Sequence, residues 1–199
     1  MERNHFIIKK YAVCFITLFC LLISLSNDAS AALEISVSTE YYSVYGNTRE
    51  EINQSLQANG PIGESGKTVT ALTKSDLQWH INFLMDDSSC QITSVTVSVE
   101  ITYILPKLEG IEYLEPELAL RWKKFMIAVE RHESSHRMIT ETSASKMEMS
   151  LSDLGPEESC DKLKTRANTT GDRVHGESIE LNKKYDLDTA HGKNQGVVF

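Results

Sequence analysis

A helical stripe that contains two histidines is the feature that most constrains how this chain can fold. The stripe advances in steps of three and four residues and is mostly apolar, at Leu118, Trp122, Phe125, Val129, Ile139, Ser143 and Met147. Such spacing is typical of one face of an α-helix that packs against a protein core. His132 and His136 continue the series between Val129 and Ile139, so we expect both imidazoles to face the protein interior.

The two histidines form the pattern His-Glu-x-x-His at residues 132–136. On a helix its first and last positions share a face, so both imidazoles can reach one metal ion. Zinc lowers the pKa of a bound water toward about 7, and Glu133 can then accept a proton during attack on a carbonyl. The alternatives are a solvated helix turn, or two core histidines that are hydrogen-bonded without a metal.

A catalytic zinc site needs a third protein ligand and an open position for water. His191 lies in a segment that also contains Tyr185, Asp186 and Asp188. These groups can orient an imidazole or a metal-bound oxyanion. This segment can equally be a polar tail at the end of the chain. The other candidate ligands in the second half of the chain are His175, Glu141 and Glu177.

The N-terminal residues 1–31 have the pattern of a secretory signal peptide. Arg3, Lys9 and Lys10 supply positive charge, residues 11–25 form an apolar run, and Ala-Ser-Ala at 29–31 is a typical cleavage site. The run is shorter than the roughly 20 residues of a membrane-spanning helix, so we expect no stable membrane insertion after cleavage. The sequence therefore predicts a secreted or periplasmic protein whose residues 32–199 form a single domain.

Cysteine content and charge narrow the possible chemistry further. Cys90 and Cys160 lie outside the predicted signal peptide, and such a pair in an exported chain predicts a disulfide bond. The chain has 20 basic and 28 acidic residues and a net formal charge of −8. This acidity argues against nucleic acid and anionic membranes as partners and leaves a peptide or protein substrate open.

The first half of the chain has the pattern of β-structure. Apolar residues alternate at 33–37, 79–83 and 95–103, and the segment 41–46 ends at Gly46. This alternation predicts an antiparallel sheet that is covered on one face only. His80 alternates with apolar neighbours and should face solvent.

The second half predicts helices. A long helix should begin at Glu115-Pro116 and run to about residue 150, with shorter helices at 160–166 and 177–185. A short helix at 49–58 is expected earlier in the chain, with Thr48 and Glu51 as a capping box. The expected fold class is α+β, with an antiparallel sheet packed against the long helix that carries the histidines.

Several pieces of the chain resemble, in order, the bacterial family of uncharacterised domains described as predicted secreted zinc-dependent proteases. The pieces are Tyr41-Tyr42-x-Val44-x-Gly46-x-Thr48 with Glu51, then Gly60-Pro61, Leu105-Pro106, Trp122-x-x-Phe125, His132-Glu133-x-x-His136 and Tyr185-Asp186-x-x-Thr189-x-His191-Gly192. One departure is Ser135, where members of the family tend to have glycine. Serine is also small, so close packing of the helix is retained.

The resemblance implies a zinc metallopeptidase-like (zincin-like) fold with His132, His136 and His191 as ligands of Zn²⁺. Glu133 would then be the general base, and Tyr185 is a candidate for oxyanion stabilisation. The expected function is a secreted zinc-dependent peptidase. The alternatives are a non-catalytic protein with a structural zinc, and a zinc amidase that acts on cell-wall peptides.

Overall fold

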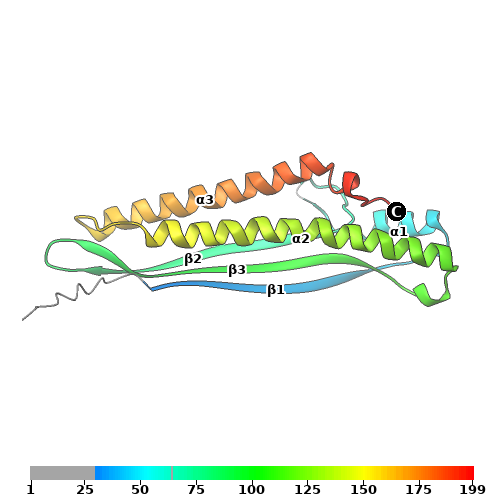
Figure 1. Ribbon diagram of the computed structural model, residues 1–199, viewed down its shortest axis with the longest axis horizontal. Coiled ribbons are helices and arrows are strands. Elements are labelled where there is room, and N and C mark those ends of the chain that lie inside the picture. The colour runs from blue at the N-terminus through cyan, green and yellow to red at the C-terminus, as the bar shows by residue number, and fades with distance from the viewer. Residues whose placement is uncertain (1–29, 64) are drawn as a thin grey trace, which may run out of the picture.

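The computed structural model describes residues 30–63 and 65–199. The predicted signal peptide, residues 1–31, lies outside the described residues except for its last two. Two layers make up the structure, a three-stranded sheet and a pair of long helices that lie over one of its faces (Figure 1). None of the helices in these ranges combines the length and the apolar character needed to cross a membrane.

The sheet is mixed, so the prediction of an antiparallel sheet is wrong for one of its strands. Strands β1 (Ser30–Val44), β2 (Leu72–Met85) and β3 (Cys90–Leu108) lie in the order β1-β3-β2. Strand β2 is antiparallel to β3, but β1 is parallel to β3. Strand β2 runs opposite to β1, and β3 runs opposite to β2. Strand β3 therefore has the same direction as β1.

The burial of β3 explains why it takes the central position. Its alternating residues Val95, Val97, Val99 and Ile101 are all at most 1% exposed, whereas most of β1 is exposed. A strand with neighbours on both sides and helices above one face buries the most apolar surface. His80 on β2 is exposed, as predicted.

Helix α1 (Arg49–Asn59) follows β1 and has the predicted capping box. The Thr48 hydroxyl accepts a hydrogen bond from the backbone N–H of Glu51, and the Glu51 carboxylate accepts one from the backbone N–H of Thr48. These two bonds satisfy N–H groups that the first turn of a helix leaves without intrahelical partners. Ile52 and Leu56 then anchor α1 at the end of the sheet (Figure 1).

Two long helices form the second layer. Helix α2 (Pro116–Ser152) matches the predicted long helix, and α3 (Cys160–Thr189) runs antiparallel beside it (Figure 1). The prediction of two separate helices within 160–185 is wrong, because α3 is continuous. The predicted polar tail is helical as far as Thr189. The described residues also form two short 3₁₀ helices, Ile111–Tyr113 and Lys193–Gln195.

Packing against the sheet explains why glycine does not interrupt α3. A Cβ atom on Gly171 would lie 2.6 Å from Trp79 Cε2, so only glycine lets the helix backbone approach this ring. Glycine inside a helix costs roughly 0.5–1 kcal/mol relative to alanine. The contact with Trp79 offsets this cost, and tertiary packing thereby overrides the local preference.

We expect Gly171→Ala and Gly176→Ala to change stability in opposite directions. No atom lies within 4 Å of a Cβ placed on Gly176, so alanine there should stabilise the protein by up to about 1 kcal/mol. At Gly171 the clash with Trp79 should instead destabilise by about 1–3 kcal/mol. Denaturant unfolding of both variants measures the difference, and equal stability would show that α3 does not depend on this close approach.

The disulfide bond between Cys90 and Cys160, predicted from the sequence, is present. It joins the start of β3 to the start of α3, and the backbones of Cys90 and Glu157 exchange two hydrogen bonds beside it. The bond therefore fastens the helical layer to the sheet at the end remote from α1 (Figure 1).

The core has two apolar clusters along α2. One lies between β3 and the two long helices and includes Met147, Leu151 and Leu163. The other lies at the α1 end and includes Trp122, Phe125 and Phe199, whose rings lie 5.3–5.4 Å apart. The stretch of α2 between these clusters carries the polar residues described next.

Candidate metal centre

The middle of α2 buries polar side chains on the face that is apolar elsewhere. Val129 is fully buried, His132 and Glu133 are each 5% exposed, and the buried residues of α2 are apolar again from Ala144 onward. His132 is therefore buried, as predicted, and His136 is largely buried, with 13% of its side chain exposed. Buried imidazoles and carboxylates cost free energy unless they are paired, so their partners decide what this region can do.

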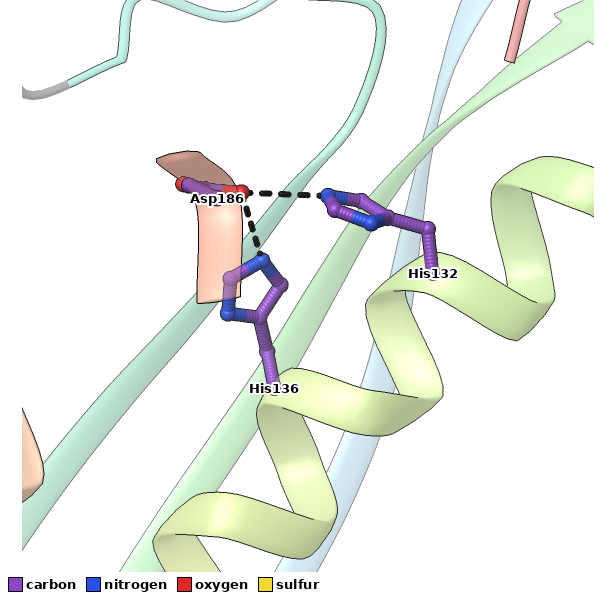
Figure 2. A group of neighbouring side chains, drawn as sticks. All are labelled: His132, His136 and Asp186. Carbon is purple, nitrogen blue, oxygen red and sulfur yellow. Dashed lines mark hydrogen bonds and ion pairs between the residues drawn. The ribbon is translucent and has the colours of Figure 1, made fainter. Parts of the chain in front are cut away.

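Both imidazoles converge on one carboxylate of α3. Nε2 of His132 and Nε2 of His136 each lie 3.1 Å from Oδ1 of Asp186 (Figure 2). One ligand atom from each residue can be chosen so that all three lie within 4.8 Å of one another. We refer to His132, His136 and Asp186 as the His-His-Asp group.

Asn182 fixes the orientation of His136. It lies one turn before Asp186 on α3, and its side-chain N–H donates to the backbone carbonyl of Ser178, 3.0 Å away. Its Oδ1 is thereby directed at Nδ1 of His136, 2.8 Å away, where it accepts a hydrogen bond. Nδ1 therefore carries the proton, and the lone pair of the neutral ring lies on Nε2, which faces Asp186.

Gln195 holds the ring of His132 through the same nitrogen, Nδ1. Its Oε1 lies 3.0 Å from Nδ1 of His132 and 3.1 Å from the hydroxyl of Tyr185, which donates to it. The Tyr185 ring is stacked on His132, with ring centroids 5.1 Å apart, and meets His136 edge-on at 5.0 Å. Tyr185, predicted as an oxyanion stabiliser, thus contacts both histidines, and its hydroxyl is bonded to Gln195.

A tight turn after α3 brings Gln195 back to His132. Ala190 and His191 have positive φ angles of 51° and 52°, and Gly192 follows at 75°. A Cβ on Gly192 would lie 2.6 Å from Cγ2 of Val197 and 3.0 Å from Cγ of His132, so glycine is needed where the backbone passes between them. Left-handed backbone at residues other than glycine costs about 1–3 kcal/mol and is found preferentially at functional sites.

The charges in the group favour a cation between the three residues. Burial alone would raise the pKa of Asp186, but hydrogen bonds from His132 and His136 and the nearby positive charge hold that pKa well below its usual range. Burial alone would lower the pKa of His136, but its hydrogen bonds to Asp186 and Asn182 raise that pKa above its usual value. Both directions show that this arrangement of imidazoles and carboxylate favours positive charge beside Asp186.

The donor set fits a divalent transition metal. Two imidazole Nε2 atoms and one carboxylate oxygen are ligands that Zn²⁺ takes in proteins, and amide oxygens already hold both rings by their Nδ1–H groups. The same arrangement would leave further coordination positions open on the side of Asp186, whose side chain is 31% exposed. The group can hold a metal ion, although its residues alone do not fix which one.

Glu133 lies beside this group and is bonded to the sheet. Its Oε2 accepts a hydrogen bond of 2.6 Å from the hydroxyl of Thr73, near the start of β2. Burial raises the pKa of the Glu133 carboxyl, and the Thr73 hydrogen bond and the charges of the two histidines oppose that rise. A carboxylate with a raised pKa is a stronger base than one in water.

The residues considered as a third ligand lie at different distances from the group. His191, the predicted ligand, is largely exposed, and its Nδ1 lies 3.5 Å from Oδ2 of Asp186. It therefore adjoins the group through Asp186. His175 packs edge-on against Trp79, while Glu141 pairs with Arg137 and Glu177 pairs with Lys146 and Arg173.

Three residues that shape this site, Asn182, Thr73 and Gln195, were not identified from the sequence, and Asp186 was identified there only as a group that could orient an imidazole. Asn182 and Asp186 are four residues apart, so on a helix they share one face. A prediction of one continuous helix over this part of the chain would have placed both of them on the face that meets His136. Thr73 is separated from Glu133 by 60 residues, and Gln195 from His132 by 63. No local pattern marks these two contacts, which depend on the packing of the whole chain.

Comparison with known proteins gives one family. Searches of curated proteins and of solved structures returned no match. Residues 39–192 match the model of a family described as "Bacterial protein of unknown function (DUF922)". The matched range contains the His-His-Asp group, Glu133, Asn182 and both cysteines of the disulfide bond. Because the match extends over most of the chain, the protein belongs to this bacterial family, DUF922.

Proposed function

We propose that this protein is a zinc-dependent hydrolase of peptide bonds. The observation that carries the proposal is the His-His-Asp group, in which two imidazoles with fixed Nδ1–H groups direct their Nε2 atoms at one carboxylate oxygen. A buried carboxylate with a raised pKa, Glu133, adjoins it on the same helix. A metal site beside a general base is the arrangement that metal-assisted hydrolysis requires.

The roles of the residues follow from their positions. His132 and His136 would hold zinc through Nε2, with Asp186 as third ligand in the observed arrangement and His191 as the ligand favoured by the sequence. Zinc, when bound, would polarise the substrate carbonyl and increase the acidity of a water molecule. Glu133 would accept a proton from the attacking water and return it to the leaving amine. Tyr185 would keep His132 in place through ring stacking and through Gln195.

The disulfide bond supports a location outside the cytoplasm. Disulfides persist in oxidising compartments and are rare in cytosolic proteins. We therefore propose a secreted or periplasmic enzyme, in line with the signal peptide expected at residues 1–31. Its substrates would be peptides, proteins or the amide bonds of cell-wall peptides.

A structural metal site is the second candidate function. The observation that favours it is His191, whose Nδ1 lies close enough to Asp186 for its side chain to approach the same ion. Four protein ligands would close the coordination sphere and exclude water, which is typical of structural zinc sites. Such a protein would bind metal and gain stability without turning over a substrate.

Removal and return of the metal tests the proposal. We expect the purified protein to contain about one equivalent of zinc and to hydrolyse a casein or cell-wall peptide substrate. Dialysis against a chelator should abolish hydrolysis, and stoichiometric zinc should restore it. Zinc binding that raises the unfolding temperature without any hydrolysis of either substrate class would favour the structural site. A wild-type protein that takes up no zinc would contradict both proposals.

A further inference from the structure

A surface groove adjoins the candidate metal centre through Gln195. It is an open groove of about 360 Å³ between the N-terminal half of α2 and the segment that follows α3. Phe125 and Ala128 line the groove from α2, and Gly196 and Val198 line it from the other side. Gln195 belongs both to this groove and to the hydrogen bonds that hold His132. We call this feature the α2 groove.

Three cationic side chains line the α2 groove. Arg121, Lys124 and Arg131 are all exposed, and none of them forms an ion pair with a residue that the structure describes. Elsewhere on α2 and α3, Arg137, Lys146 and Arg173 are paired with glutamates. In a chain with a net charge of −8, a groove with three cations and no carboxylate among its lining residues is a local reversal of charge.

We propose that the α2 groove binds an acidic, extended peptide segment. Arg121 and Arg131 are ten residues apart on one helix, which places them about 15 Å apart along its axis. An extended chain covers that distance with roughly four to five residues. Several carboxylates spaced along a peptide can therefore meet the three cations, and Lys124 lies between the two arginines.

The lining of the groove favours a peptide over other anions. A single phosphate is too small to contact cations spread along this length of helix, and a flat anionic membrane cannot follow a concave surface. Ala128, Ile127 and Val198 offer apolar contacts between the charges, which suit the side chains of a peptide. Ile127 and Val198 are 57% and 56% exposed, so both are free to contact a ligand.

Binding of a peptide in the α2 groove does not depend on hydrolysis, so the test measures the affinity of the protein for a labelled peptide. The probe is a fluorescein-labelled peptide in which glutamate alternates with leucine, and its matched control has glutamine in place of each glutamate. We expect fluorescence anisotropy to show binding of the acidic peptide to the full chain and little binding of the glutamine peptide. Sodium chloride should weaken the binding, because exposed charges are screened.

Variants of the protein assign the binding to the groove. The triple variant Arg121→Gln, Lys124→Gln, Arg131→Gln should bind the acidic peptide about tenfold more weakly, since three exposed charge contacts are lost. Lys123→Gln removes an exposed charge from the same helix outside the groove lining and should leave binding unchanged. Because all four positions are exposed, folding should be retained, which circular dichroism checks.

Three outcomes would overturn the proposal. The first is equal binding of the glutamine peptide, which would remove the role of charge. The second is wild-type affinity in the triple variant, which would place the peptide elsewhere. The third is full displacement by inorganic phosphate at an ionic strength where sodium chloride displaces nothing, which would make the groove a phosphate site. Zinc content and hydrolysis do not enter these readouts, so failure of the proposed hydrolase activity is distinguished from failure of this inference.

Discussion

Glu133→Gln is expected to lower hydrolysis by about 10²–10⁴-fold while the zinc content of the protein stays unchanged. Glutamine has the shape of glutamate, and its side-chain oxygen can still accept the hydrogen bond from Thr73. It cannot accept a proton from water at neutral pH, so the general base is removed without a cavity. The measurement is kcat/KM on a peptide substrate, together with the metal content of the same preparation.

A matched substitution controls for the change of charge on α2. Glu130→Gln also removes one glutamate charge from α2, but at an exposed position. It should leave both the activity and the zinc content as in the wild type. Loss of zinc from Glu133→Gln would make Glu133 a residue that supports metal binding. Undiminished hydrolysis by Glu133→Gln would exclude it as the base.

Zinc affinity should fall most when a member of the His-His-Asp group is replaced. His132→Ala, His136→Ala and Asp186→Asn each remove an atom that converges on the common centre, whereas Asn182→Ala removes only the support of His136. Loss of a supporting residue typically costs about 10- to 100-fold in metal affinity, so the three ligand variants should lose more than that. Competition with a chromogenic chelator measures all four affinities.

His191→Ala decides between the two candidates for the third ligand. We expect it to weaken zinc binding less than Asp186→Asn does, because Oδ1 of Asp186 already lies 3.1 Å from both imidazoles. His175→Ala serves as control, since this residue packs against Trp79. If His191→Ala loses zinc and Asp186→Asn keeps it, the assignment from the sequence is right and Asp186 only orients the ligands.

The sequence determined the features that depend on neighbours along the chain. The capping box fixed the start of α1, Pro116 fixed the start of α2, and the steps of three and four residues identified the buried face of α2. His132 and His136 could be placed on that face because helix periodicity is a local property. The pairing of Cys90 with Cys160 followed from their being the two cysteines outside the predicted signal peptide.

Only the tertiary structure decided the features that depend on contacts between distant segments. The central position of β3, and with it the parallel pairing of β1, reflects how much apolar surface each arrangement buries. The continuity of α3 through Gly171 depends on Trp79, which lies on another layer. Asp186 meets the histidines from 50 and 54 residues away. A periodic pattern shows which face of a helix is buried, but the packing of the layers decides which residue it meets there.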